Sequence, residues 1–312
     1  MKIFLTGVAG FIGSRVAAAL LARGDSVVGF DDFNDFYDPA IKRRNAAEIT
    51  ALGARVIEGD LRVKTQVEAA LADGCDVVVN LAARAGVRPS LENPELYTDT
   101  NVKGTVHILE AMRARGLRKL VHASSSSVYG GQEKVPFSED DPINRPWSPY
   151  AATKRANELF LQSYHHLYGI ESFALRFFTV FGPGQRPDLA IMKFIQLIEA
   201  GKEVPFYGDG QSGRDYTFIE DIVGGVVSSI DRVKGCEIIN LGGDEPVTLT
   251  EMVQTIEKAT GKKARLKHLP DQPGDVPRTM ADISKARRML GYEPKTSFAE
   301  GVAKQLEWYR SL

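Results

Sequence analysis

The sequence predicts an α/β protein with a doubly wound parallel sheet of the Rossmann type and a smaller C-terminal α/β lobe. A strand, a glycine-rich turn and a helix follow one another at the N-terminus. Short runs rich in valine and isoleucine then alternate with helical segments, which indicates parallel strands covered on both faces. This alternation fades from about residue 178. We therefore expect a first domain over residues 1–177, with returning segments near 215–241, and a second lobe mostly within 178–312.

Composition limits the classes of function. The 312 residues are 43% hydrophobic and 25% charged, which suits a large globular core and excludes disordered classes. The net charge of −1 gives no sign of a nucleic-acid partner. Cys75 and Cys236 are far apart in apolar settings typical of reduced thiols. The histidines show no metal-ligand spacing, so no metal site is expected. With no signal sequence or apolar membrane span, the sequence predicts a cytoplasmic protein.

The glycine-rich turn follows the first strand, residues 3–5, and contains Gly7, Gly10 and Gly13. A helix rich in alanine and leucine then continues to Arg23. Glycines in such a turn let a pyrophosphate approach the backbone, and the helix N-terminus adds amide donors. A glycine-rich turn alone is a weak signal, but its place between a strand and a helix favours a dinucleotide site.

The second strand, residues 26–30, ends at Asp31, which lies 18 residues beyond Gly13. An acid there can accept hydrogen bonds from the adenosine ribose and repels a 2′-phosphate, so NAD is favoured over NADP. The alternative is an ordinary loop aspartate. The helix that follows carries the basic residues 42–44, which we expect to form a solvated face.

Three more strands are expected over residues 55–61, 75–83 and 119–123. In a doubly wound sheet, ligands sit at the carboxyl ends of the strands. Polar segments follow two of these ends, at 82–88 and at 124–130. The second contains four consecutive serines, which can also form a flexible linker. Their position directly after an apolar strand favours hydroxyl groups held over a ligand.

Tyr150 and Lys154 are spaced by one helical turn, so their side chains share one face of a helix that runs to about Tyr168. A nearby ammonium favours the phenolate, so the tyrosine can act as a base nearer neutral pH. The same spacing also occurs by chance in surface helices. A strand over 172–178 follows the helix, whereas a later strand over 237–241 can belong to either part of the chain.

Taken together, these stretches resemble the extended short-chain dehydrogenase/reductase family over nearly the whole chain. The resemblance rests on the glycine turn at 7–13, the hydroxyl run that ends at Gly130, and Tyr150 with Lys154. Within this family the chain is most similar to the nucleotide-sugar 4-epimerases, and specifically to UDP-glucuronate 4-epimerases. The segments shared with those enzymes are 34–39, 85–88, 176–183 and 186–188.

The resemblance implies NAD-dependent C4 epimerisation of a UDP-hexose, with UDP-glucuronate to UDP-galacturonate as the expected reaction. It would proceed by reversible hydride transfer through a 4-keto intermediate. Similar dehydratases carry acids where this chain has Ser126 and Ser127, and similar decarboxylases carry one at the second position. Serines cannot replace those acids, which disfavours elimination. The alternatives are a UDP-glucose/UDP-galactose or N-acetylhexosamine 4-epimerase and, behind these, a UDP-glucuronate decarboxylase, a net reductase or a non-catalytic NAD-binding interaction protein.

The resemblance also assigns residues to the catalytic and cofactor sites. Tyr150 is expected to be the base, Ser125 to orient and relay its proton, and Lys154 to hold the nicotinamide ribose and lower the tyrosine pKa. The expected NAD-binding set is Gly7, Gly10, Phe11, Ile12, Gly13, Asp31, Asn34, Asp60, Leu61, Leu81, Ala82, Ala83, Asn101, Tyr150 and Lys154.

For the substrate, the resemblance places Arg214 on the diphosphate, Phe206 against the uracil and Asp275 on its ribose. Asp275 ends a Gln-Pro-Gly-Asp motif that lacks the arginine found there in galactose-type epimerases, which leaves Arg278 as an uncertain second cation. The hexose carboxylate is expected near Ser126, Ser127, Thr179 and Arg186, and the remaining expected substrate contacts are Arg88, Ser125 and Lys193. The resemblance also implies a homodimer formed by the helix of Tyr150 and the helix that begins near residue 94.

Overall fold

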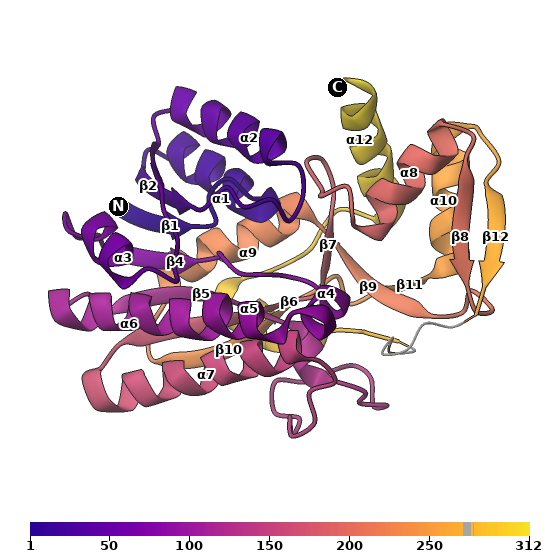
Figure 1. Cartoon of the computed structure of the whole chain (residues 1–312). Helices are drawn as coiled ribbons and strands as arrows, with labels where there is room; N and C mark the ends of the chain where they lie inside the picture. Colours follow the sequence, from indigo (N-terminus) through magenta and orange to yellow (C-terminus); the bar gives the residue numbers. More distant parts are fainter. Residues whose placement is uncertain (271–275, 277) are drawn as a thin grey trace.

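A computed structural model describes residues 1–270, 276 and 278–312, so Asp275 and its motif lie outside the described residues. Seven parallel strands form the central sheet, in the order β10-β6-β5-β4-β1-β2-β3 (Figure 1). Strands β1, β2 and β3 follow one another toward one edge of the sheet, and the chain then returns to the other side of β1 and adds β4, β5, β6 and β10 toward the opposite edge. This change of direction confirms the predicted doubly wound sheet. The strands are β1 (Lys2–Thr6), β2 (Ser26–Asp31), β3 (Arg55–Glu58), β4 (Val77–Asn80), β5 (Lys119–Ser125), β6 (Glu171–Phe177) and β10 (Cys236–Leu241).

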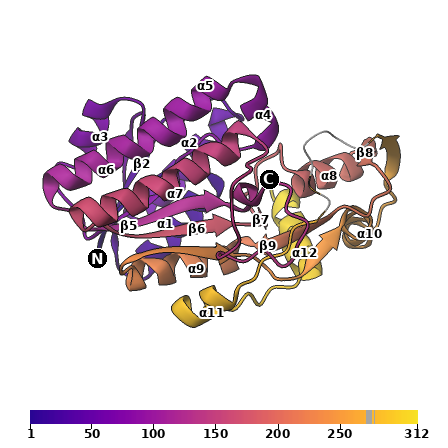
Figure 2. The same ribbon diagram turned by 90° about the horizontal axis from the view of Figure 1, so that it is seen from below.

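Helices cover both faces of this sheet (Figure 2). One layer contains α1 (Phe11–Ala22), α2 (Pro39–Ala51) and α9 (Ile219–Arg232). The other contains α3 (Lys64–Ala70), α6 (Gly104–Arg115) and α7 (Pro149–Tyr168). Buried apolar side chains fill the space on each side, as the apolar runs of strands covered on both faces predict. None of the helices in the described part of the chain is long and apolar enough to cross a membrane.

The helix expected from residue 94 is divided into three segments. It begins as α5 (Pro94–Tyr97), continues as the π-helix η1 (Thr98–Lys103), and becomes the α-helix α6. Two short elements also leave strand ends, α4 (Val87–Glu92) after β4 and the 3-10 helix η2 (Ser126–Tyr129) after β5. Wide helical turns of the π type occur frequently at functional sites. Here the π-helix places its side chains beside the carboxyl end of β4.

The strand over 237–241 belongs to the large sheet. As β10, it pairs in parallel with β6 and forms one edge. The chain reaches this edge only after it has contributed strands to the C-terminal lobe. The alternation of strand and helix is interrupted before β10. The local sequence therefore did not show which part of the chain this strand joins.

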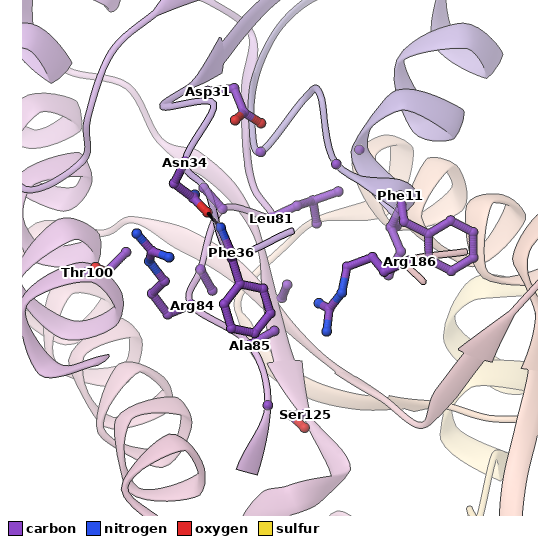
Figure 3. A pocket seen from close by; sticks show the side chains of 18 of the residues that line it. Phe11, Asp31, Asn34, Phe36, Leu81, Arg84, Ala85, Thr100, Ser125 and Arg186 are labelled. Carbon is purple, nitrogen blue, oxygen red and sulfur yellow. Dashed lines mark hydrogen bonds between the residues drawn. The ribbon is translucent and has the colours of Figure 1, made fainter. Parts of the chain in front are cut away.

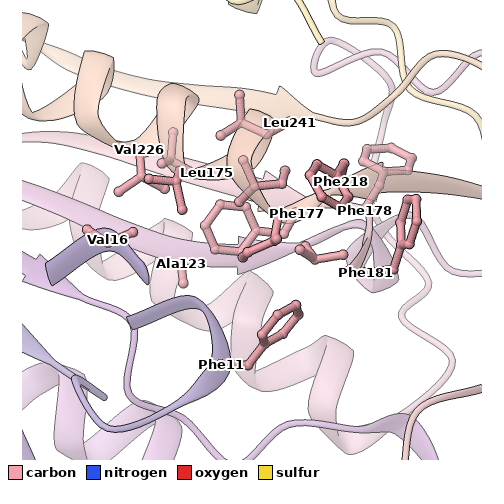
Figure 4. Packing of buried hydrophobic residues seen from close by; sticks show 14 of the residues in the cluster. Phe11, Val16, Ala123, Leu175, Phe177, Phe178, Phe181, Phe218, Val226 and Leu241 are labelled. Carbon is pink, nitrogen blue, oxygen red and sulfur yellow. The ribbon is translucent and has the colours of Figure 1, made fainter. Parts of the chain in front are cut away.

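The C-terminal lobe carries two small sheets, which lie to the right in Figure 1. One has the order β11-β9-β7 and the other pairs β12 with β8. A single apolar core extends from the large sheet into this lobe through Phe177, Phe178, Phe181 and Phe218 (Figure 4). The lobe is therefore anchored on the first domain. Its elements are β7 (Thr179–Phe181), α8 (Ala190–Glu199), β8 (Glu203–Tyr207), β9 (Gly213–Phe218), β11 (Pro246–Thr248), α10 (Leu249–Thr260), β12 (Arg265–Leu269) and α12 (Phe298–Arg310), and α11 (Ser284–Leu290) packs beside α9 and β10.

Candidate active site

A large cavity lies at the carboxyl ends of the central strands, between the first domain and the loops after β6 and β7 (Figure 3). Its position agrees with the general rule for doubly wound sheets. All but one of the expected cofactor residues line it, as do three of the expected substrate contacts. These lining residues are Gly7, Gly10, Phe11, Ile12, Gly13, Asp31, Asn34, Asp60, Leu61, Leu81, Ala82, Ala83, Tyr150 and Lys154, together with Ser125, Thr179 and Arg186.

The glycine turn brings the start of α1 against the end of β1. Gly7 has a φ of +69°, and its carbonyl accepts a hydrogen bond from the Gly10 N–H at 3.1 Å. A Cβ atom on Gly13 would lie 2.0 Å from the Gly7 oxygen, so only glycine fits there. Helix α1 starts at Phe11 without a side-chain cap. Its first N–H groups are therefore left for an anion in the cavity.

Asp31 ends β2 with its carboxylate held by the backbone. One oxygen accepts the Ala9 N–H and the other the Phe33 N–H, both at 3.0 Å. Burial raises the pKa of Asp31, and these two hydrogen bonds and the charge of Lys42 oppose that rise. Each carboxylate oxygen retains a free lone pair. The side chain is therefore pre-oriented to accept hydrogen bonds from two ligand hydroxyls.

Lys42 differs from the expected solvated face. Its side chain is only 5% exposed, lines the cavity, and donates to the Asn34 carbonyl at 2.9 Å. Burial lowers the pKa of Lys42, whereas Asp31 and Asp32 raise it. Arg43, in contrast, is exposed and paired with Glu58, as expected for a solvated face. Helical periodicity could not reveal this difference, because the loop before α2 folds back over Lys42.

Tyr150, at the start of α7, interacts with the side chain of Ser125 at the end of β5. The Ser125 oxygen accepts from the Ser127 N–H at 3.2 Å and from the Ser127 hydroxyl at 2.9 Å. With both acceptor positions used, the Ser125 hydroxyl has its own proton left to donate to the phenol. Burial raises the pKa of Tyr150, while Ser125 and the charge of Arg186 lower it. Ser125 and Arg186 therefore both favour the phenolate form of Tyr150.

Lys154 lies one turn beyond Tyr150 and is only 3% exposed. Its ammonium donates to the Ala123 carbonyl at 2.7 Å and lies 5.8 Å from the centre of the Tyr150 ring. Burial lowers the pKa of Lys154 to about 8, and Glu158 raises it. The groups that lower the pKa of Tyr150 are Ser125 and Arg186. The prediction that Lys154 lowers the tyrosine pKa therefore gains no support from this arrangement.

Asn101 is the expected cofactor residue that does not line the cavity. Its side chain bonds both backbone groups of Arg84, accepting the N–H at 2.8 Å and donating to the carbonyl at 3.0 Å. It also donates to the Thr153 hydroxyl at 3.0 Å, and Thr153 in turn donates to the Tyr150 carbonyl. Asn101 thus connects the loop after β4 with helix α7. Direct contact between Asn101 and a cofactor stays a prediction.

Two cavity residues that the sequence did not single out carry unsatisfied polar atoms. Within the described residues, Arg84 Nε and Thr100 Oγ1 are buried and have no hydrogen-bond partner. Both residues line the cavity (Figure 3). Such atoms are costly to bury unless a ligand or water bonds them. Arg84 lies within the polar segment after β4, which was the only signal available for it.

Two of the residues expected near a sugar carboxylate, Thr179 and Arg186, reach the cavity. Arg186 follows β7 and directs its guanidinium into the cavity, with Asp188 as an ion-pair partner at 2.8 Å (Figure 3). The ring of Phe36 lies 5.2 Å from this guanidinium. Ser127 is bonded to Ser125, as described above. The positive charge of Arg186 therefore lies at the same cavity as Tyr150.

The other expected substrate residues lie outside this cavity in the described part of the chain. Arg88 and Lys193 are exposed on α4 and α8. Phe206 is buried in the lobe core, with His268 5.1 Å away between ring centres. Arg214, on β9, donates to the Gly213 carbonyl at 3.0 Å. Their roles in binding substrate, and that of Ser126 at the start of η2, stay predictions.

Comparisons with known proteins agree with this geometry. Residues 4–305 match the family model described as GDP-mannose 4,6 dehydratase. The UDP-glucuronate 4-epimerase of Thermodesulfobacterium geofontis is 44% identical over 310 residues, which cover 97% of this chain and 94% of that protein.

The comparison with solved structures likewise finds 4-epimerases of UDP-sugars. The UDP-glucuronic acid 4-epimerase of Bacillus cereus, in complex with UDP-glucuronic acid and NAD, aligns with a TM-score of 0.94 at 36% identity. That alignment covers 100% of this chain and 99% of the other. The UDP-glucose 4-epimerase of Thermotoga maritima, with UDP-glucose, aligns with a TM-score of 0.92 at 30% identity, over 100% and 99% of the two chains.

Proposed function

This chain belongs to the extended short-chain dehydrogenase/reductase family, and we propose that it is an NAD-dependent epimerase that interconverts UDP-glucuronate and UDP-galacturonate. One observation carries the proposal. Tyr150, Ser125 and Lys154 form one wall of a cavity whose other end is a glycine turn suited to a dinucleotide. The similarity to UDP-glucuronate 4-epimerases over nearly the whole chain supports the choice of substrate.

The residues of the cavity fit NAD. The uncapped start of α1 and the glycine turn suit a pyrophosphate, and Asp31 suits the adenosine ribose. The unsatisfied atoms of Arg84 and Thr100 provide further polar contacts on the cavity wall. When bound, NAD supplies the reversible oxidation and reduction of the sugar at C4.

The chain itself supplies the proton transfer. Tyr150, as the phenolate, takes the proton of the sugar O4 hydroxyl, and it returns that proton to O4 when the alcohol is formed again. Ser125 donates a hydrogen bond to the phenolate and so holds it in the geometry for transfer. Lys154, fixed on the Ala123 carbonyl, places a positive charge beside the tyrosine ring. Inversion then requires that the ketone turns within the cavity and presents its other face.

The arrangement of acids favours epimerisation over elimination. The described carboxylates that line the cavity are Asp31, Asp32 and Asp60, at the ends of β2 and β3. Strands β4 and β1 separate them from β5, which carries Ser125. Ser126 and Ser127 follow on the tyrosine side, and neither can serve as the general acid that loss of water requires.

Arg186 is proposed to bind the sugar carboxylate. Arg186→Gln is expected to lower kcat/KM for UDP-glucuronate by about 10- to 100-fold, because a charge-assisted hydrogen bond contributes about 1.5–3 kcal/mol. Arg186 also lowers the pKa of Tyr150, so the variant will affect any substrate to some extent. The ratio of kcat/KM for UDP-glucuronate over UDP-glucose isolates the carboxylate contact.

Arg44→Gln is the matched control, because Arg44 is an exposed arginine on α2 and should leave the ratio unchanged. An equal loss on both substrates in Arg186→Gln would exclude a contact with the carboxylate.

The reaction is tested by incubating the wild-type protein with UDP-glucuronate and separating the products. UDP-galacturonate is expected, with no net change in the absorbance of reduced cofactor. Faster turnover of UDP-glucose would instead identify a neutral-sugar 4-epimerase, the function of the Thermotoga maritima relative. A UDP-pentose product would identify a decarboxylase, and net formation of reduced cofactor would identify a redox enzyme.

A homodimer formed through α7 is also proposed. Its support is the row of exposed apolar side chains on this helix, Leu159, Phe160 and Leu167, beside α6. Apolar patches of this kind frequently mark interfaces. Sedimentation at micromolar protein should give twice the mass of the 34.2 kDa chain, and a monomer at all concentrations would contradict the proposal. The cytoplasmic location stays a prediction.

A further inference from the structure

Helix α7 contacts the end of β5 through three side chains on successive helical turns. Tyr150 interacts with Ser125, Lys154 donates to the Ala123 carbonyl at 2.7 Å, and Glu158 accepts the Ser124 hydroxyl at 2.6 Å. Tyr150 and Lys154 belong to the proposed reaction, whereas Glu158 has no role assigned to it so far. We propose that Glu158, with Arg176 as its counterion, is a positioning residue that keeps the Lys154 ammonium charged at the cavity.

The Glu158 carboxylate is buried, with 1% of the residue exposed, and it is fully hydrogen-bonded. One oxygen accepts the Ser124 hydroxyl and Arg176 Nε, the latter at 2.9 Å. The other accepts Arg176 Nη2 and Arg155 Nη1, both at 2.9 Å. Burial raises the pKa of Glu158, but these bonds outweigh it and hold the pKa below its ordinary value. Glu158 is therefore a permanent negative charge one turn from Lys154.

Arg176 is held in place from the opposite side. It is 1% exposed on β6, and its Nη1 donates to the Tyr129 hydroxyl at 2.9 Å. Tyr129 donates in turn to Asn240 on β10 at 2.7 Å, and Asn240 bonds the carbonyls of Phe137 and Asp282. The ion pair is thus fixed by a buried polar network across β6 and β10. Neither partner can turn away to solvate its charge.

The charges around Lys154 explain why this position needs a carboxylate. On α7 the ionisable neighbours are Tyr150, Arg155 and Glu158, and His122 faces Lys154 from β5. Burial lowers the pKa of His122 well below its ordinary range, so it is neutral. Arg176 lies on β6, Tyr97 contacts Tyr150 from α5, and Arg186 acts on Tyr150 from the loop after β7.

Among these neighbours, Glu158 carries the negative charge that opposes the desolvation of Lys154. Without Glu158, the Lys154 ammonium would be buried with no carboxylate one helical turn away to offset its desolvation. The pKa of Lys154 is about 8 in the intact protein, so a small further decrease would discharge it near neutral pH. The expected change in the pKa of Lys154 is a decrease, because loss of a nearby negative charge lowers the pKa of an amine.

The inference rests on the proposed function for its effect on activity, but its main test does not require turnover. Lysine Cε is labelled with ¹³C, and Lys154 is titrated by NMR between pH 6 and 10 in the NAD-loaded protein. The Lys154 signal is assigned by its absence in Lys154→Met. Glu158→Gln is expected to lower the pKa of Lys154 by about one unit, since a nearby opposite charge contributes about 1–3 units.

The alkaline limb of kcat/KM should move to lower pH by the same amount. Glu158→Asp keeps the charge and should restore both values, although it shortens the side chain. Glu110→Gln is the matched control, since Glu110 is a carboxylate on the neighbouring helix α6 that bonds Arg113 and Tyr164. It should leave the pKa of Lys154 unchanged.

A merely structural role for Glu158 would lower the thermal unfolding temperature and leave the titration of Lys154 where it was, which would overturn the inference. If Glu158→Gln fails to fold because Arg176 is left unpaired, Lys154 is titrated in Glu158→Gln/Arg176→Gln and in Arg176→Gln, which differ only in the charge at position 158. An equal pKa of Lys154 in these two variants would be equally decisive against the inference. If the wild type does not epimerise UDP-glucuronate but the pKa decreases, only the proposed function fails.

Discussion

Tyr150→Phe is expected to lower kcat for epimerisation of UDP-glucuronate by about 10²- to 10⁴-fold, the usual range for loss of a general base. The change removes the oxygen proposed to receive the O4 proton and keeps the aromatic ring. The edge contact with Tyr97, 6.2 Å between ring centres, should therefore persist. Binding of UDP-glucuronate, measured by calorimetry, is expected to change little, so the loss should appear in kcat and not in affinity.

Tyr164→Phe provides the matched control for this variant. Tyr164 lies on the same helix, and its hydroxyl donates to Glu110 at 2.8 Å, away from the cavity. Removal of that hydroxyl should leave kcat within about twofold of wild type, because surface changes of this kind have small effects. If Tyr150→Phe also kept kcat within a few-fold of wild type, another group would have to be the base.

The large sheet and the glycine turn were predictable because local patterns determine them. A run such as the one in β4 is apolar on both faces only if helices cover it on both sides, and that pattern is visible in the sequence. Gly13 carries a similarly local signal, since its contact is with Gly7 six positions earlier. The positions of Tyr150 and Lys154 follow from helical spacing alone.

What could not be predicted depends on contacts between distant segments. Lys42 is buried because its ammonium donates a hydrogen bond to the Asn34 carbonyl in the loop before α2, and periodicity along α2 contains no trace of that loop. The bonds of Asn101 to the backbone of Arg84 likewise join the π-helix to the loop after β4, and its contact with a cofactor stays a prediction. The ion pair of Glu158 with Arg176 likewise joins α7 to β6, and no spacing rule links them.

The glycine turn leaves no room for a side chain at Gly13, and Gly13→Ala tests this directly. The added methyl group would lie 2.0 Å from the Gly7 oxygen and 2.8 Å from the Gly7 carbonyl carbon. These are backbone atoms at the close approach of α1 to β1, so relief requires that the helix move. We expect the free energy of unfolding to decrease by about 1–3 kcal/mol, as for other overpacked sites. NAD content after gel filtration should decrease at least about tenfold, since the displaced helix start is the group proposed to hold the pyrophosphate.

Gly224→Ala separates this steric effect from the general effect of alanine in a helix. Gly224 is exposed in α9, and a Cβ atom there meets nothing within 4 Å. Alanine is favoured over glycine by about 0.5–1 kcal/mol inside a helix, so this variant should unfold at the same or a higher temperature than wild type. Opposite signs for the two substitutions would establish that the turn, and not helix propensity, determines the result. If Gly13→Ala kept both its NAD content and its unfolding temperature, the close approach would not constrain the site, and the cofactor would have to be held mainly by Asp31 and the strand ends.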